Sequence, residues 1–516
     1  MTPQQIDQFK KTVEEGYTFK GDSVIIGGAM IDGETIPGLF VKLPLKTMNR
    51  HGLIAGATGT GKTKSLQVLA ERLSEKGVPV LLMDIKGDLS GLAKPSPGHP
   101  KIDERMQKIG LPFKPTGYPV EFFSLTGKEG VQLRATVSEF GPVLMSKILD
   151  LNDNQSGLLA VLFKYADDKR LPLVDLKDLK ELMRWAMGQG RLEFQESYGR
   201  VSTASMGAIL RKIVELEQQG AEVFFGEPST DIEDFMRVDQ DGKGIINIIR
   251  LTDIQEKPKL FSTFMLQLLG ELYAKMPEIG DPDQPELVFF IDEAHLIFKN
   301  ASKALLEELE TIIKLIRSKG IGIFFVTQNP RDIPDEILSQ LGTKIQHALR
   351  AFTAKDRKNI KLTAENFPVT DFYNTDKLLL KLGIGEALVT GLGRKGRPTP
   401  LVHTMMRAPQ SRMDILTPSE LNEILLKSEL RRKYQKPIDK ESAYEILQEK
   451  LHRAQAESEE EAEREAEKTK KRGRKEKSTF EKILTSSVGR TVVRELTRSL
   501  LGVLGLGYTR RRRRRY

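Results

Sequence analysis

One run of residues constrains the fold of this chain more than any other feature. An apolar segment ending at Ala55 leads into Gly-Ala-Thr-Gly-Thr-Gly-Lys-Thr over 56–63, and residues 65–73 then have a helical pattern. A strand, a glycine-rich loop and a helix in this order form a phosphate-binding loop, or P-loop. We therefore predict an α/β fold with a mainly parallel sheet and a nucleotide site at this loop.

The residue types in the loop suit a polyphosphate. Its glycines permit positive φ, so that successive N–H groups and the start of the following helix face the anion. Lys62 is expected to reach the β and γ phosphates, and Thr63 to hold Mg²⁺ through its hydroxyl. The residues expected to bind the nucleotide are Gly56, Ala57, Thr58, Gly59, Thr60, Gly61, Lys62, Thr63 and Lys64.

A second stretch has the pattern of a Walker B strand. The apolar run 287–291 ends in Asp292 and Glu293. Asp292 is expected to position Mg²⁺, directly or through water, and Glu293 to act as the general base on the attacking water. Downstream of a P-loop, this pair predicts nucleotide hydrolysis.

Polar residues at the ends of two further apolar runs are also candidates. Gln328 follows the run 321–326 and is expected to meet the γ-phosphate or the attacking water, with Thr327 a weaker candidate. Asp84 closes the run 78–83. It contacts either the metal shell or a neighbouring subunit, or it caps the end of its strand.

Composition narrows the class of protein. The 516 residues contain no cysteine, which excludes disulfides and thiolate metal sites. The sequence has no signal-like segment and no apolar run near the ~20 residues that span a bilayer, so we expect a cytoplasmic protein. A net charge of +9 permits nucleic acid or anionic lipid as a partner.

Changes of pattern along the chain suggest its domain organisation, with the globular part ending near residue 408. A helical block stands between the two halves of the nucleotide-binding core, as an insertion or as part of a larger helical layer. The expected parts are a short N-terminal helix and β cap (1–48), the first part of the core (49–141), the helical block (142–236), the second part of the core (237–408), a charged helical linker (409–478), and an amphipathic helix with an Arg-rich tail (479–516).

The C-terminal part leaves alternatives open. Apolar residues recur every four positions from Phe480 to Leu500, which suits a helix packed on the main domain or one that docks on a protein or a membrane surface. The run Arg510–Arg515 is either a solvated tail or a contact for phosphate backbones or anionic lipid.

The motifs distinguish this chain from two other branches of P-loop enzymes, the DEAH helicases and the GTPases. Residues 292–295 spell the DEAH box, but the Ser/Thr-Ala-Thr strand and the Q-x-x-G-R-x-x-R run of DEAH helicases are absent, as is the Asn-Lys-x-Asp motif of GTPases. A P-loop, an Asp-Glu strand, a helix ending in Arg317-Ser-Lys-Gly and a strand ending in Thr-Gln together resemble the HerA/FtsK superfamily. Runs 48–63 and 290–298 more closely resemble a bacterial group of HerA-like proteins of unknown function, the DUF853 (YjgR-like) family.

The resemblance implies a RecA-like ATPase core that uses ATP and Mg²⁺ and assembles as a homo-hexameric ring. It implies that Arg317 completes a neighbour's site as an arginine finger; the alternative is an exposed arginine favoured by the helix dipole. Residues 1–48 are too short for the N-terminal β-barrel of HerA proper. The implied activity is translocation of double-stranded DNA. The alternatives are a nonmotor ATP-dependent switch or a secretion-type ATPase, acting on a protein or membrane partner through the C-terminal tail.

Overall fold

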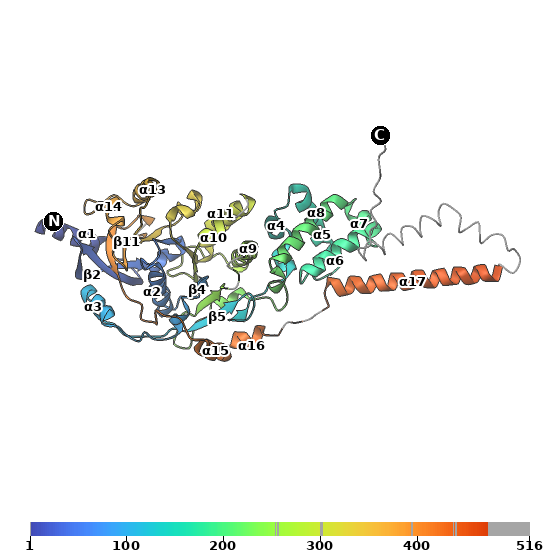
Figure 1. Ribbon diagram of the computed structural model, residues 1–516, viewed down its shortest axis with the longest axis horizontal. Coiled ribbons are helices and arrows are strands. Elements are labelled where there is room, and N and C mark those ends of the chain that lie inside the picture. Colours follow the sequence, from blue (N-terminus) through green and yellow to red (C-terminus); the bar gives the residue numbers. More distant parts are fainter. Residues whose placement is uncertain are drawn as a thin grey trace, which may run out of the picture. The chain divides into compact units, whose positions relative to one another are not determined.

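A single mixed sheet forms the centre of the fold in the computed structural model, which describes residues 2–472 except 253, 255–256, 300–302, 394–395, 437 and 439–440 (Figure 1). Within these residues the sheet has twelve strands. Their order is β2 (Glu34–Pro44), β1 (Ser23–Ile31), β12 (Val402–Met406), β11 (Glu386–Thr390), β10 (Thr343–Gln346), β3 (Gly52–Ala55), β9 (Ile321–Thr327), β8 (Leu287–Ile291), β4 (Val80–Asp84), β7 (Ile246–Arg250), β5 (Val120–Ser124) and β6 (Val131–Gln132).

The strands from β10 to β6 are all parallel, and the other end of the sheet is antiparallel. Strands β3, β9, β8 and β4 are fully buried, as expected of strands covered on both faces. The register pairs Ala55 with Thr327 and Met83 with Ile291. The carboxyl ends of these strands therefore meet at one edge of the sheet. The predicted α/β, mainly parallel architecture is confirmed.

Strands β1 and β2, which the sequence suggested as a small cap, extend the central sheet. Strand β1 pairs antiparallel with β12, with Gly27 opposite Met406. A side chain at Gly27 would meet the backbone oxygen of Met405 at 2.2 Å, so glycine permits this close approach. The N-terminal segment is thereby joined to strands that follow it by nearly 400 residues.

The described helices vary in length from one turn to eight. They are α1 (Pro3–Gly16), α2 (Lys62–Glu75), α3 (Pro100–Ile109), α4 (Val137–Ile148), α5 (Asp153–Asp168), α6 (Leu176–Met187), α7 (Arg191–Tyr198), α8 (Thr203–Gln218), α9 (Pro258–Lys275), α10 (His295–Phe298), α11 (Lys303–Ile316), α12 (Asp335–Leu338), α13 (Ala354–Glu365), α14 (Thr375–Leu379), α15 (Pro418–Lys427), α16 (Glu429–Tyr434) and α17 (Ala443–Arg472). None of them, over the described residues, combines the length and apolar character needed to cross a membrane.

Helices α4 to α8 follow one another between β6 and β7. All of them except α7 follow a polar N-cap, including Asn152 before α5 and Asp175 before α6, which each form a capping box. Their shared core contains Tyr165, whose hydroxyl accepts a hydrogen bond from Trp185 Nε1 at 3.0 Å. Phe194 packs against Tyr165 with the two ring centroids 5.1 Å apart. This segment corresponds to the helical block that the sequence pattern indicates.

The packed part of the chain continues past residue 408 and reaches Tyr444. A buried carboxylate on α2 holds the first residues of this extension. Glu71 accepts hydrogen bonds from the backbone N–H groups of Gln410 and Ser411, both at 2.9 Å, and from the Ser411 hydroxyl. These contacts hold the segment after β12 against α2, and Tyr434 is buried further along.

Residues from Glu445 onward form a separate unit, of which α17 is described as far as Arg472. Its polar surface carries ion pairs one turn apart, such as Arg453 with Glu449 at 2.5 Å. The amphipathic helix predicted within 479–504 and the run 510–515 lie outside the described residues.

Candidate active site

The P-loop leaves the carboxyl end of β3 and turns into α2. Gly56 has φ 155° and Gly61 φ 114°, conformations that side chains rarely adopt. A Cβ at Gly56 would lie 2.5 Å from that of His347, so the glycine also allows close packing. Thr60 Oγ1 donates to Ala57 O at 2.7 Å and closes the loop. The loop leads directly into the first turn of α2, where the N–H groups of a helix start favour an anion.

The basic side chains of the P-loop have different surroundings. Lys62 is buried, and its Nζ donates to Ala57 O at 3.2 Å. Burial lowers the pKa of Lys62, while the Glu293 carboxylate opposes that shift. Lys64 instead turns towards the segment after β12 and donates to Met413 O at 2.5 Å. Of the two side chains, that of Lys62 stays at the P-loop and that of Lys64 points away from it.

Asp292 and Glu293 follow β8, two strands away from the P-loop strand. Both are buried, and Asp292 Oδ1 accepts a hydrogen bond from Glu293 N at 2.9 Å. Burial and the adjacent Glu293 charge raise the pKa of Asp292 to about 7. Glu293 has φ 46°, a strained conformation for a residue with a side chain. Such strain is typical of functional sites and is maintained by the surrounding structure.

The donor set suits Mg²⁺. A threonine hydroxyl, a carboxylate and nucleotide phosphates are oxygen ligands, and Mg²⁺ is commonly bound by one or two carboxylates plus substrate phosphates. A divalent cation beside the buried Asp292 would also favour the ionised form of this carboxyl, which is the form that binds a metal. Thr63, in the first turn of α2, and Asp292 are therefore the residues that would hold the ion.

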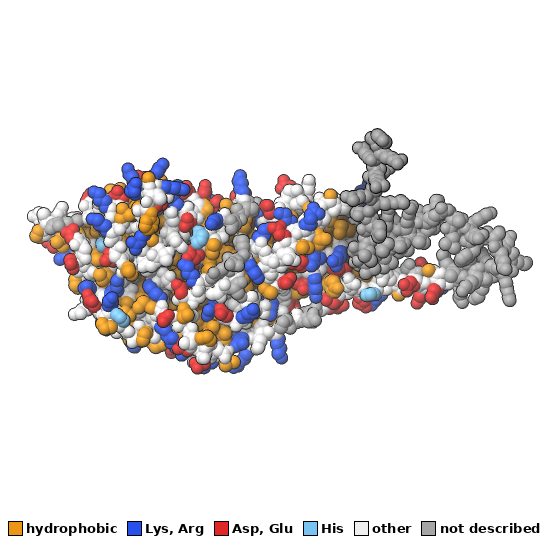
Figure 2. All heavy atoms as spheres, viewed as in Figure 1, with side chains coloured by type: hydrophobic (Ala, Val, Ile, Leu, Met, Phe, Trp, Pro, Cys, Tyr) orange, Lys and Arg blue, Asp and Glu red, His pale blue; other side chains and the backbone are white. Residues whose placement is uncertain are grey.

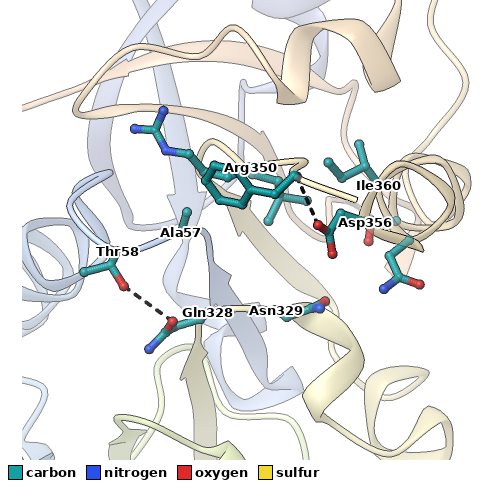
Figure 3. Close-up of a pocket in the computed structure, with 11 residues that line it drawn as sticks. Ala57, Thr58, Gln328, Asn329, Arg350, Asp356 and Ile360 are labelled. Atoms are coloured by element: carbon teal, nitrogen blue, oxygen red, sulfur yellow. Dashed lines mark hydrogen bonds between the residues drawn. The ribbon is translucent and has the colours of Figure 1, made fainter. Parts of the chain in front are cut away.

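Gln328 lies directly beside the P-loop at the end of β9 (Figure 3). Thr58 Oγ1 donates a hydrogen bond to its Oε1 at 3.4 Å. The two residues line a cavity of about 380 Å³ whose far side is formed by α13, including Asp356 and Ile360. Thr327 is turned away and donates to Asp332 Oδ2 at 3.0 Å. Of the two candidates at this strand end, Gln328 faces the loop.

Asp84 caps the turn after its own strand. Its carboxylate accepts hydrogen bonds from the backbone N–H groups of Gly87 at 2.7 Å, Asp88 at 3.1 Å and Leu89 at 3.2 Å. Burial and the charge of Asp88 raise the pKa of Asp84 to about 6. Of the alternatives considered, the strand-end cap is the one that the structure shows.

Arg317 lies at the opposite edge of the sheet. It precedes β9, and the seven residues of that strand, at ~3.3 Å each, place it about 20 Å from Gln328. Its side chain is 41% exposed and pairs with Asp281 at 3.0 Å. The structure therefore brings Lys62, Asp292, Glu293 and Gln328 to one edge and leaves Arg317 outside that cluster.

Two residues near the site were not singled out from the sequence. His347 is buried behind the P-loop, where its Nδ1–H donates to Glu386 O at 2.8 Å and its Nε2 accepts from the Ser65 hydroxyl at 2.9 Å. Burial lowers the pKa of His347 to about 4, so the ring is neutral and this tautomer fits both partners. Lys86, in the turn capped by Asp84, contacts the Glu293 carboxylate. No sequence signal distinguishes either residue: His347 follows β10, whose sequence TKIQ is mostly polar, and Lys86 is an exposed lysine in a turn.

A second, more apolar cavity adjoins the start of α2. It has a volume of about 420 Å³ and borders Gly61, Lys64 and Ser65. Its walls come from α3 and from the ends of β11 and β12. The apolar and basic residues that line it include Ile102, Arg105, Ile384, Met406, Ala408 and Pro409.

This arrangement defines a class of protein. A P-loop strand, a neighbouring strand β9 with a polar end, and an Asp-Glu strand beyond it form the core of a RecA-like P-loop ATPase. The fold of the solved conjugative coupling protein TrwB, unbound form, agrees: its TM-score is 0.50 at 16% identity, over 79% of this chain and 94% of that one.

The sequence profile of the family described as Helicase HerA-like C-terminal matches residues 32–513, and the chain belongs to this family. The HerA family predicted from the motifs is thus confirmed. The DNA double-strand break repair helicase HerA of Saccharolobus solfataricus is 25% identical over 357 residues, which are 68% of this chain and 63% of that protein. The DNA import protein CedB of Sulfolobus acidocaldarius is 24% identical over 67% of this chain and 50% of its own length. The chain spans less than two thirds of either relative.

Proposed function

We propose that this chain hydrolyses ATP to ADP and phosphate with Mg²⁺ and couples hydrolysis to movement of double-stranded DNA through a homo-hexameric ring. The observation that carries the proposal is the meeting of Lys62, Asp292, Glu293 and Gln328 at one edge of the sheet. The relatives named for DNA repair and DNA import support the choice of DNA.

Each side chain has a separate task in the proposed reaction. The P-loop N–H groups and Lys62 bind the phosphates, and the apolar cavity beside Ser65 receives the adenine. Mg²⁺, when bound by Thr63 and Asp292, supplies charge neutralisation for the β and γ phosphates. Glu293 accepts the proton of the attacking water, and Gln328 orients that water.

The surface offers a site for an anionic polymer. Lys and Arg side chains gather over α13 (Figure 2). Lys355, Arg357, Lys358 and Lys361 are all exposed on this helix. Salt-sensitive contact with phosphate backbones is the chemistry that such a surface favours.

Linear duplex DNA is expected to raise the ATPase rate of the purified protein about five-fold or more, because a motor couples its substrate to turnover. The measurement is the steady-state rate with and without DNA at two salt concentrations, with Lys62→Ala as the inactive control. Stimulation should weaken at high salt. An ATPase rate that exceeds that of Lys62→Ala but does not change when DNA is added would contradict the translocase proposal. It would favour the nonmotor switch or a protein substrate.

Magnesium affinity is expected to depend on pH through Asp292. Because the pKa of this carboxyl is raised to about 7, it holds a proton below that pH and must release it before it binds the ion. The apparent Mg²⁺ affinity with bound nucleotide should therefore fall on acidification through pH 7, by up to about ten-fold per pH unit beyond the nucleotide's own dependence.

Calorimetric Mg²⁺ titrations at about pH 6, 7 and 8 would measure this dependence. Asp292→Asn is the matched control, since it keeps the shape of the side chain but has no proton to release. The Mg²⁺ affinity of Asp292→Asn should be weaker than that of the wild type. It should change with pH only as far as protonation of the nucleotide itself requires. Equal slopes for the two proteins would rule out the assigned role of Asp292.

A further inference from the structure

Lys86 lies in a turn whose backbone is fixed by the fold. The buried Asp84 carboxylate binds the three N–H groups that follow Lys86, those of Gly87, Asp88 and Leu89. Gly87 has φ 79°, which lets the chain reverse at this point. Because the backbone on its carboxyl side is held in this way, the direction in which the Lys86 side chain leaves the turn is determined by local structure.

The Lys86 ammonium contacts Oε1 of Glu293, the proposed general base. The Lys86 side chain is 47% exposed, whereas that of Glu293 is only 7% exposed. Burial alone would lower the pKa of Lys86, but the bond to Glu293 raises it above the ordinary value. The lysine therefore stays charged at neutral pH, and it can still be reached from solvent.

The second oxygen of Glu293 is also unavailable to a water molecule. Oε2 is buried and accepts no hydrogen bond from the described residues, although His295 Nδ1 lies 3.2 Å away. One carboxylate oxygen is thus bound by an ammonium group and the other is shielded. A general base must have an oxygen within hydrogen-bond reach of the water that it deprotonates. The observed orientation of Glu293 does not meet this requirement.

We propose that Lys86 is a positioning residue that holds Glu293 in a resting orientation and releases it when a phosphate anion draws the ammonium away. The proposal rests on the proposed ATP hydrolysis. The resting cluster contains two cations, Lys62 and Lys86, and two carboxylates, Asp292 and Glu293. An arriving phosphate adds negative charge beside Lys86 and competes with Glu293 for it. The terminal phosphate of the nucleotide and a backbone phosphate of DNA share this chemistry.

The test compares Lys86→Met with Lys86→Arg in the full chain. Steady-state ATPase kinetics are measured with and without linear duplex DNA, and nucleotide affinity is measured with a fluorescent ADP to show that the site is folded. Lys164→Met is the matched control, because Lys164 forms an exposed ion pair with Asp168 on α5. Lys86→Arg should behave like the wild type, since a guanidinium can form the same pair.

Whether DNA or the nucleotide supplies the phosphate decides whether kcat or KM changes in Lys86→Met. If DNA releases the lysine, Lys86→Met should raise kcat without DNA by about three- to ten-fold, the effect of a partly buried ion pair, and reduce the stimulation by DNA. If the nucleotide releases it, kcat at saturating ATP stays the same and KM falls by a similar factor. Either result supports the proposal.

Two results would overturn it. A fall in kcat of Lys86→Met would mean that the lysine assists turnover and does not restrain the base. Unchanged kcat and KM would mean that the pair has no role in turnover. The failure of the proposed function would look different, because the wild type itself would then show no ATP turnover that depends on Glu293.

Discussion

Glu293→Gln is expected to lower the ATP turnover number by about 10²–10⁴-fold while nucleotide binding persists, because a general base contributes a factor of this size. The amide has nearly the shape of the carboxylate but accepts no proton at neutral pH. In the proposed reaction the P-loop and Lys62 bind the phosphates of the nucleotide, and Lys62 Nζ donates to Ala57 O and not to Glu293. The variant should therefore retain ATP in the site.

Single-turnover hydrolysis and filter binding of ATP measure the two quantities separately. Glu293→Asp is an informative companion: it keeps the carboxylate but withdraws it by one methylene, so part of the activity should be lost. If Glu293→Gln hydrolysed ATP at close to the wild-type rate, another group would have to be the base. Loss of ATP binding would instead indicate that Glu293 shapes the nucleotide site.

The sequence predicted the elements of the core well because their signals are local. Strands β8 and β9 are uninterrupted apolar runs that end in polar residues, a pattern typical of parallel strands buried on both faces. The helix expected over residues 65–73 after the P-loop lies within α2, Lys62–Glu75. In each case a cap or a periodic pattern lies within the segment itself.

Packing between distant segments could not be predicted in this way. The end of the packed part was expected near residue 408, but Glu71 binds the backbone of residues 410 and 411 from about 340 positions away. Nothing in the local pattern of either segment indicates that contact. The pairing of β1 with β12 has the same origin, since strand order depends on contacts between segments that are remote in sequence.

The residues of the candidate site also divide into those with a local sequence signal and those placed by contacts between distant segments. Lys62, Asp292, Glu293 and Gln328 each stand at the end of an apolar strand or in the P-loop, and parallel strands bring such ends together. Lys86 stands two residues beyond the end of β4, and its partner Glu293 is more than 200 residues later. An exposed lysine has no pattern that distinguishes it from other surface lysines, so only the three-dimensional structure reveals its contact with the base.

Arg317→Ala is expected to lower kcat by about 10³-fold or more and to change nucleotide affinity little, as for the loss of an arginine finger. The arginine lies at the sheet edge opposite its own P-loop, about 20 Å away by the length of β9, so as an arginine finger it would act on a neighbouring subunit and not on its own site. Its ion pair with Asp281 offers the matched control. Asp281→Asn breaks this exposed pair but keeps the guanidinium, and its rate should stay within about three-fold of the wild type.

Mixing two inactive variants tests whether Arg317 acts between subunits. A site formed by an Arg317→Ala subunit next to a Glu293→Gln subunit has an intact base from the first and an intact arginine from the second. In rings assembled at random from equal amounts, about a quarter of the sites are of this kind, so up to about a quarter of the wild-type rate should return if sites act independently. Rings assembled from either variant alone should stay inactive. Mixed rings that remain inactive while both variants bind ATP and assemble would show that Arg317 does not complete a neighbour's site, and its place at the helix end would then be explained by the helix dipole alone.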